Sequence, residues 1–256
     1  MLGSSKKKLL VSGCSFTASG EHSHVPIKEV HGEYLEGYDY RFKKWPEIVS
    51  EQLDLKLVNL ARCGNSNERI AESLMEYILK NGHDDIEMVL VGWTEFNRFL
   101  FETADKTSYF KPPEKYKMNI TTWRTGGRPQ DDLSLWQEFR KKFGIVKIEQ
   151  DIKTIFLLQE FLEIRNIEHK FFSLLRFDNI HSSYSNKQFF RRVVNNEFFN
   201  QINGENFHGW PVFTQLGGKP SFIPLPRNVI KDGMDGHPNK RGHQMIAKDI
   251  LNFIER

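Results

Sequence analysis

The sequence predicts an α/β protein whose parallel sheet is covered by helices on both faces. The first hundred residues contain three short apolar strands, each followed by a glycine. The segments between these strands carry apolar residues at helical spacing. Helices between successive strands return the chain to the same edge of the sheet, so the strands run parallel. The length of 256 residues suits one large domain, and 21 Phe and 5 Trp supply bulky material for its core.

Composition excludes several classes of protein. A net charge of +3 is too small to argue for nucleic acid as a partner, although the pI of 8.7 is mildly basic. No apolar run approaches the roughly 20 residues that a membrane span needs. The apolar stretch Leu9–Val11 is also shorter than the ~7–15 residues of an export signal. We therefore expect a cytoplasmic protein that does not enter a membrane. Only the basic pI and the pair Arg191-Arg192 favour nucleic acid as a partner, so the sequence does not predict one.

The first strand ends in a turn that presents a serine. The apolar run Leu9–Val11 reads as a buried parallel strand, and Gly13 breaks it just before Ser15. Open α/β sheets bind ligands at the carboxyl ends of their strands, so Ser15 is a candidate nucleophile if a histidine elsewhere activates it. The alternative is that Ser15 caps a following helix.

The polar loop over residues 18–43 carries His22, His24 and His31. Without a nearby cysteine, or a carboxylate at helical spacing, these histidines do not predict a metal site. Cys14 and Cys63 form neither a disulfide framework nor a metal site by their spacing, so buried packing is their expected role. We expect neither a metal nor a cofactor.

The next elements repeat the pattern of the first. The sequence predicts a helix over 45–53, which Pro46 opens, and a strand over 56–61. A second glycine turn at Gly64 leads into a helix over 69–79, which Asn65, Ser66 and Asn67 suit as caps. A third strand over 85–94 ends at another glycine.

The regular alternation of short strands and helices does not continue after the third strand. Residues 98–147 are too long for a plain connection, so we expect an insertion there and a second one at about 176–230. Between them lie a predicted helix over 151–167 and a fourth strand over 168–175. Four tryptophans could stack on a sugar or belong to the core: Trp93, Trp123, Trp136 and Trp210.

The segment before the terminal helix, predicted over 244–254, completes a possible catalytic set. His237 is the one histidine with a carboxylate beside it in a turn between elements, so it can take the proton of Ser15, and Asp235 can orient the imidazole. The N–H groups of Ser15 and Gly64 follow neighbouring strands and can point at one oxyanion. The alternative is an ordinary turn at His237 with Asp235 as a plain cap.

In this order the motifs resemble those of the SGNH (GDSL-like) hydrolase family. The resemblance covers residues 6–97 and 232–256, and its most specific parts are Asp235-Gly236-His237-Pro238-Asn239 and Gly13-Cys14-Ser15-Phe16-Thr17. It implies a three-layer α/β/α sandwich with a flavodoxin-like parallel sheet, here one domain over 1–256 that carries the insertions. It also implies Ser15 as nucleophile and oxyanion donor, Gly64 as second donor, and Asp235 with His237 completing a triad.

The chain departs from the family pattern at two sites. The family usually has an oxyanion-binding Asn two residues after the third glycine, where this chain has Thr94, so Thr94 or Asn97 would have to donate instead. The family's Asp often lies three residues before the histidine, where this chain has Met234, which leaves Asp235 or else Asp232 as the acid. Cys14 replaces an aspartate that the chemistry does not need.

The resemblance implies hydrolysis of an ester, either an O-acyl group on a carbohydrate or a small acyl ester. The alternative, which the missing Asn favours, is a catalytically weak binding or structural protein on the same scaffold. The Gly-Cys-Ser-Phe-Thr and Gly-Trp-Thr pattern is similar to proteins of tailed phages and bacteria, and a phage-encoded chain would act in the host cytoplasm.

Overall fold

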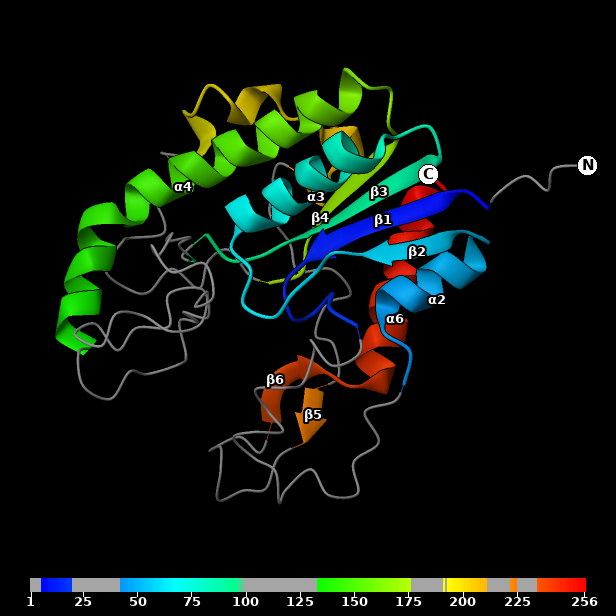
Figure 1. Ribbon diagram of the computed structural model, residues 1–256. Coiled ribbons are helices and arrows are strands. Elements are labelled where there is room, and N and C mark those ends of the chain that lie inside the picture. Colours follow the sequence, from blue (N-terminus) through cyan, green and yellow to red (C-terminus); the bar gives the residue numbers. More distant parts are fainter. Residues whose placement is uncertain are drawn as a thin grey trace, which may run out of the picture.

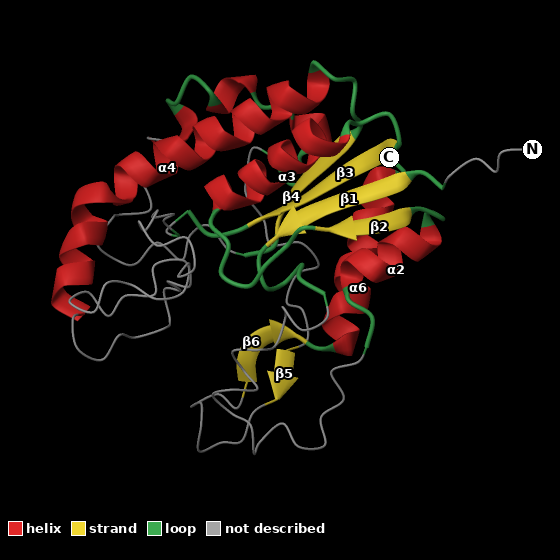
Figure 2. Ribbon diagram, viewed as in Figure 1, coloured by secondary structure: helices red, strands yellow, loops and turns green. Residues whose placement is uncertain are grey.

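A four-stranded parallel sheet forms the centre of the molecule (Figures 1 and 2). The computed structural model describes residues 6–19, 42–96, 98, 133–175, 191, 193–210, 222–224 and 234–256, with side chains of the long helix from residue 146 onward. The strands are β1 (Lys8–Gly13), β2 (Lys56–Asn59), β3 (Ile86–Trp93) and β4 (His169–Ser173). The predicted α/β class and the parallel sheet are confirmed.

The order of the strands is β2-β1-β3-β4. The chain leaves β1 toward one edge to form β2 and then crosses back to form β3 on the other side of β1. This order is consistent with a flavodoxin-like fold, in which ligands bind where the direction of winding changes, next to the first strand. The register pairs Gly13 with Gly92, so β1 and β3 end side by side at that position.

Helices cover both faces of the sheet, as predicted. On one face lie α3 (Asn67–Asn81) and α4 (Leu133–Glu163); on the other lie α2 (Trp45–Gln52) and α6 (Lys240–Ile254) (Figure 1). Each pair of helices packs against its own side of the strands because alternate strand residues point to opposite faces. Leu10 and Val91 contribute to the core beneath α3 and α4, whereas Leu9, Val11 and Leu90 contribute to the core beneath α2 and α6.

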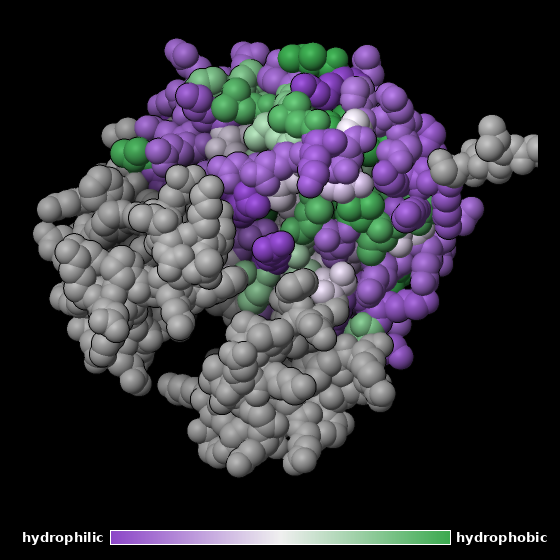
Figure 3. Space-filling view, in the orientation of Figure 1, coloured by the Kyte–Doolittle hydropathy of each residue, from purple (hydrophilic) through white to green (hydrophobic). Residues whose placement is uncertain are grey.

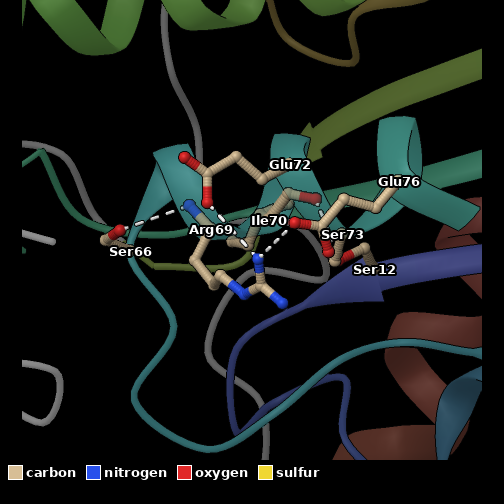
Figure 4. Close-up of polar contacts among 7 residues, drawn as sticks. All are labelled: Ser12, Ser66, Arg69, Ile70, Glu72, Ser73 and Glu76. Atoms are coloured by element: carbon tan, nitrogen blue, oxygen red, sulfur yellow. Dashed lines mark hydrogen bonds and ion pairs between the residues drawn. The ribbon is translucent and has the colours of Figure 1, made fainter. Parts of the chain in front are cut away.

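Helix α3 is attached to β1 by a hydrogen bond as well as by packing. The hydroxyls of Ser12 on β1 and Ser73 on α3 lie 2.9 Å apart (Figure 4). At the start of the helix the Ser66 side chain accepts the Arg69 N–H at 3.4 Å, which makes Ser66 the N-cap. Arg69 is within salt-bridge distance of Glu72 and Glu76 on the outer face (Figure 4). The Ser66 cap marks the start of α3, and the Ser12–Ser73 contact connects the helix to β1.

The β4 edge of the sheet has a partner of its own. A single parallel bridge joins Phe171 to Phe207, and the His208 N–H donates to the Phe171 carbonyl at 2.8 Å. The segment around this bridge contains two short 3₁₀ turns, η6 (Phe199–Gln201) and η7 (Gly204–Asn206). Covering an edge in this way reduces the number of unpaired backbone groups that it presents to solvent.

The structure corrects three predicted boundaries. The helix expected over 151–167 begins at Leu133, so 133–147, assigned above to an insertion, are helical. The terminal helix begins at Lys240 rather than at residue 244. His237 lies in a strand, β6 (Met234–Pro238), and not in a turn; β6 pairs antiparallel with β5 (Phe222–Pro224), which the sequence did not predict. Periodicity cannot detect a three-residue strand.

The surface carries scattered apolar residues. Figure 3 shows hydrophobic residues interspersed among hydrophilic ones on the face that it displays. The most exposed of the large apolar side chains are Leu79 on α3 and Ile164 just after α4. Within the described part of the chain, no helix combines the length and the apolar character needed to cross a membrane.

Candidate active site

Ser15 lies directly after the central strand β1. The Cys14 carbonyl accepts hydrogen bonds from the N–H groups of Thr17 and Ala18, at 2.9 and 3.0 Å, so the chain turns tightly around Ser15. No helix starts before residue 19, where this described segment ends, so within it the structure does not support the alternative that Ser15 caps a helix. Ser15 is only 3% exposed.

Both β1 and β3 carry a glycine where they lie side by side, and this leaves room for the turn that follows β1. A Cβ added to Gly13 would overlap the hydroxyl oxygen of Thr17, and one added to Gly92 would lie 2.5 Å from Leu174 Cδ1. Real Cβ atoms do not approach other atoms so closely, so any larger residue would push the turn away from the sheet. Thr17 folds back into the space that the two glycines leave, and this sets where Ser15 is presented.

His237 reaches Ser15 from the far end of the chain. The two residues are 222 positions apart, yet Nε2 of His237 lies 3.0 Å from Oγ of Ser15. This is hydrogen-bond distance, and it is the geometry that a general base needs toward its nucleophile. The imidazole is 3% exposed and its ring centre lies 5.5 Å from that of Phe16, so packing limits its rotation.

The position of His237 follows from the elements around it. β6 leads directly into α6, and the Asn239 side chain caps that helix by accepting the Gly242 N–H at 2.9 Å. Helix α6 packs against α2 on one face of the sheet, and His243 on its first turn accepts the Trp45 N–H at 3.3 Å through Nδ1. His243 is therefore a buried contact between two helices.

The carboxylate of the predicted triad has no described position. The backbone of Asp235 belongs to β6, two residues before His237, but its side chain lies outside the described part of the chain, as does Asp232 altogether. The structure therefore brings together two of the three predicted triad residues and leaves the assignment of the acid a prediction.

Gly64 lies in the turn after β2, next to the end of β1. Its φ of 81° belongs to the left-handed region, which glycine adopts without strain. The neighbouring Asn65 donates from Nδ2 to the Gly13 carbonyl at 3.1 Å, which draws this turn toward the turn that carries Ser15. Among the hydrogen bonds between described residues, none has the Gly64 N–H as its donor.

Thr94, the predicted substitute for the family's oxyanion-binding Asn, is buried. It directly follows β3 and is fully buried, and its hydroxyl has no hydrogen-bond partner among the described residues. Its backbone N–H donates to Oδ1 of Asn67 at 2.9 Å, and its carbonyl accepts from Nδ2 of Asn67 at 3.2 Å. Asn97, the other predicted donor of the third strand, lies outside the described residues.

Two polar residues around the site were not predicted from the sequence. Asn67 was interpreted as a cap, whereas its side chain binds the end of β3. Arg98, which is 2% exposed, donates from Nη1 to the Asn65 carbonyl at 3.3 Å and lies 3.7 Å from a Glu95 carboxylate oxygen. Nothing in the local pattern signals the bonds of Asn67 to Thr94 and of Arg98 to Asn65, because they join segments that are distant in sequence.

A buried ionic cluster lies beside the start of α3. Nζ of Lys147 on α4 is 2.5 Å from Asp151 and 2.6 Å from Glu68, and the Lys147 and Asp151 side chains are fully buried. Burial raises the pKa of Asp151 to about 8, although Lys147 and Asn67 act to lower it. A lysine and an aspartate four positions apart on an otherwise apolar helix face were the available signal, and the expectation of an insertion over 98–147 obscured it.

Metal binding and similarity to known proteins add no further assignment. The described residues contain no group of three or more His, Cys, Asp or Glu side chains arranged to hold a metal ion, and His22, His24 and His31 lie outside them. No family model, curated protein or solved structure matches the chain.

Proposed function

We propose that the protein is a serine hydrolase of the SGNH type that cleaves an ester. The observation that carries the proposal is the 3.0 Å contact between Ser15 Oγ and His237 Nε2, at the carboxyl end of a central parallel strand. The proposal extends to the fold: the three layers would be those of the SGNH hydrolases, with insertions within 98–147 and 176–230.

The chemistry would use these groups in a fixed sequence. His237 takes the proton as Ser15 Oγ attacks the ester carbonyl, and it returns that proton to the departing alcohol, which leaves an acyl group on Ser15. Water then repeats the cycle and releases the acid. The N–H of Gly64, which has no acceptor among the described residues, and that of Ser15 would hold the oxyanion. Asp235 would orient the imidazole.

The substrate would be an O-acyl group on a carbohydrate or a small acyl ester. Among the tryptophans considered as walls for a sugar, Trp93 is fully buried in the core beneath α3 and α4, and Trp210 packs against the same core, so neither supports a stacking platform. Trp123 lies outside the described residues, as does the side chain of Trp136. A small acyl ester is therefore the probe with which to begin.

A catalytically weak binding protein on the same scaffold is the second candidate. It is favoured by Thr94, whose backbone is bonded to Asn67 and whose hydroxyl is buried, because no third oxyanion donor is then described. Loss of one such donor costs ~100- to 1000-fold in rate. Slow turnover would therefore agree with the hydrolase, and complete absence of turnover would agree with the binding protein.

The experiment compares His237→Ala with His208→Ala in hydrolysis of a short-chain aryl ester. His208 is a half-buried histidine that packs on Phe253, so its variant controls for loss of an imidazole. We expect kcat to fall at least ~1000-fold in His237→Ala, since the nucleophile loses its base, and to change little in His208→Ala. Equal kcat in the two folded variants would contradict the proposal.

A further inference from the structure

The end of β3 is held by a single side chain that comes from the second turn. Asn67 is fully buried at the first position of α3, three residues after Gly64. Its amide oxygen accepts the Thr94 N–H and its amide nitrogen donates to the Thr94 carbonyl, at 2.9 and 3.2 Å. The N–H and the carbonyl of Thr94, the first residue after β3, are thus both hydrogen-bonded to one side chain.

This contact is one of a pair. Asn65, two residues earlier, donates to the carbonyl of Gly13 at the end of β1. In the strand order β2-β1-β3, the turn after β2 thus binds the ends of the next two strands of the sheet, β1 through Asn65 and β3 through Asn67. The two amides connect the Gly64 turn to the segments that carry Ser15 and Thr94.

The two hydrogen bonds to Thr94 fix the orientation of the Asn67 amide. An asparagine side chain can bind Thr94 in this way only with its oxygen toward the N–H and its nitrogen toward the carbonyl. Because Asn67 is fully buried, loss of its amide would leave both backbone groups of Thr94 without this partner.

We propose that Asn67 is a positioning residue of the oxyanion site, which holds the Thr94 end of β3 against the Gly64 turn. The inference rests on the proposed hydrolase function. It assigns catalytic consequence to a residue that touches neither the substrate nor the triad.

The test compares Asn67→Ala with Asn81→Ala, a variant of the same residue type at the exposed far end of the same helix. We measure kcat and KM for an aryl ester, the folded fraction by circular dichroism, and hydrogen exchange at the Thr94 amide. For Asn67→Ala we expect kcat to fall ~10- to 100-fold with KM nearly unchanged, because misplacement by about 1 Å is enough for such a loss. Thr94 should exchange at least ~10-fold faster, and Asn81→Ala should match the wild type.

Asn67→Leu is the second variant and carries the test if Asn67→Ala does not fold. It keeps the branching of the side chain but can neither donate nor accept a hydrogen bond, so kcat should fall in the same direction by about 10-fold and Thr94 exchange should accelerate. A folded Asn67→Ala with the kcat of Asn81→Ala, or a loss of kcat with unchanged Thr94 exchange, would overturn the inference alone. Absence of turnover in the wild type and in Asn81→Ala alike would overturn the hydrolase proposal and the catalytic role of Asn67 with it.

Discussion

Gly13 shows how one residue determines the geometry of the Ser15 turn. It pairs with Gly92 across β1 and β3, and the side chain of Thr17 occupies the space where its Cβ would be. The absence of a side chain, and not an unusual backbone angle, is what the position requires. A serine after a strand can be recognised in a sequence, but the packing of Thr17 into the gap between two strands cannot, because it depends on the register.

We predict that Gly13→Ala lowers the free energy of unfolding by ~1–3 kcal/mol, the usual cost of an added methyl group in a packed site. The cost should shrink in a Thr17→Ala background, which removes the atoms that the new Cβ would overlap. Urea denaturation of the four proteins of this cycle measures both quantities. An equal cost of Gly13→Ala with and without the Thr17 side chain would show that the overlap is not its cause.

Helix α4 carries two buried ionisable residues that face the start of α3. Lys147 and Asp151 lie one turn apart and face Glu68 at the start of α3, so two helices of one layer are joined by buried charge as well as by apolar contact. Burial raises the pKa of Asp151 to about 8, from an ordinary value of 3.8. At pH values between about 4 and 8, Asp151 therefore keeps its proton in the folded chain but loses it in the unfolded chain.

This difference predicts how stability depends on pH. Because the folded state binds more protons than the unfolded state between pH 4 and 8, the free energy of unfolding should decrease as pH rises through this window and level off above it. Asp151→Asn removes the titrating group, so relative to it the wild type should lose at least ~1 kcal/mol between pH 5 and pH 8. Glu163→Gln, at an exposed position of the same helix, should parallel the wild type in urea denaturation. Parallel curves for wild type and Asp151→Asn would contradict the raised pKa.

Among the helices and strands, the sequence predicted those that belong to the repeated order of strand, glycine and helix. Apolar runs that end at Gly13, Gly64 and Gly92 indicated the first three strands and their parallel direction. The start of α4 at Leu133 and the pairing of β5 with β6 were missed. The first lay in a stretch whose prolines and glycines suggested an insertion, and the second joins strands too short to show alternation.

At the scale of the whole molecule, the candidate site depends on contacts between the two ends of the chain. Ser15 follows the first strand and His237 precedes the last helix, and the sheet and the α2–α6 layer bring them to 3.0 Å. The order of motifs predicted this pairing. The Asn67 bridge to Thr94 was not predictable, because only the assembled sheet places the start of α3 beside the end of β3.

The central claim is that Ser15 is a nucleophile activated by His237. The most direct measurement is labelling with a fluorophosphonate followed by peptide mapping, in the wild type, in Ser15→Ala and in Ser50→Ala, a buried serine of α2 that binds a backbone carbonyl of its own helix. The account predicts one label, on Ser15, which is retained in Ser50→Ala and absent from Ser15→Ala. A well-folded wild type that takes no label, or a label on another residue that persists in Ser15→Ala, would contradict it.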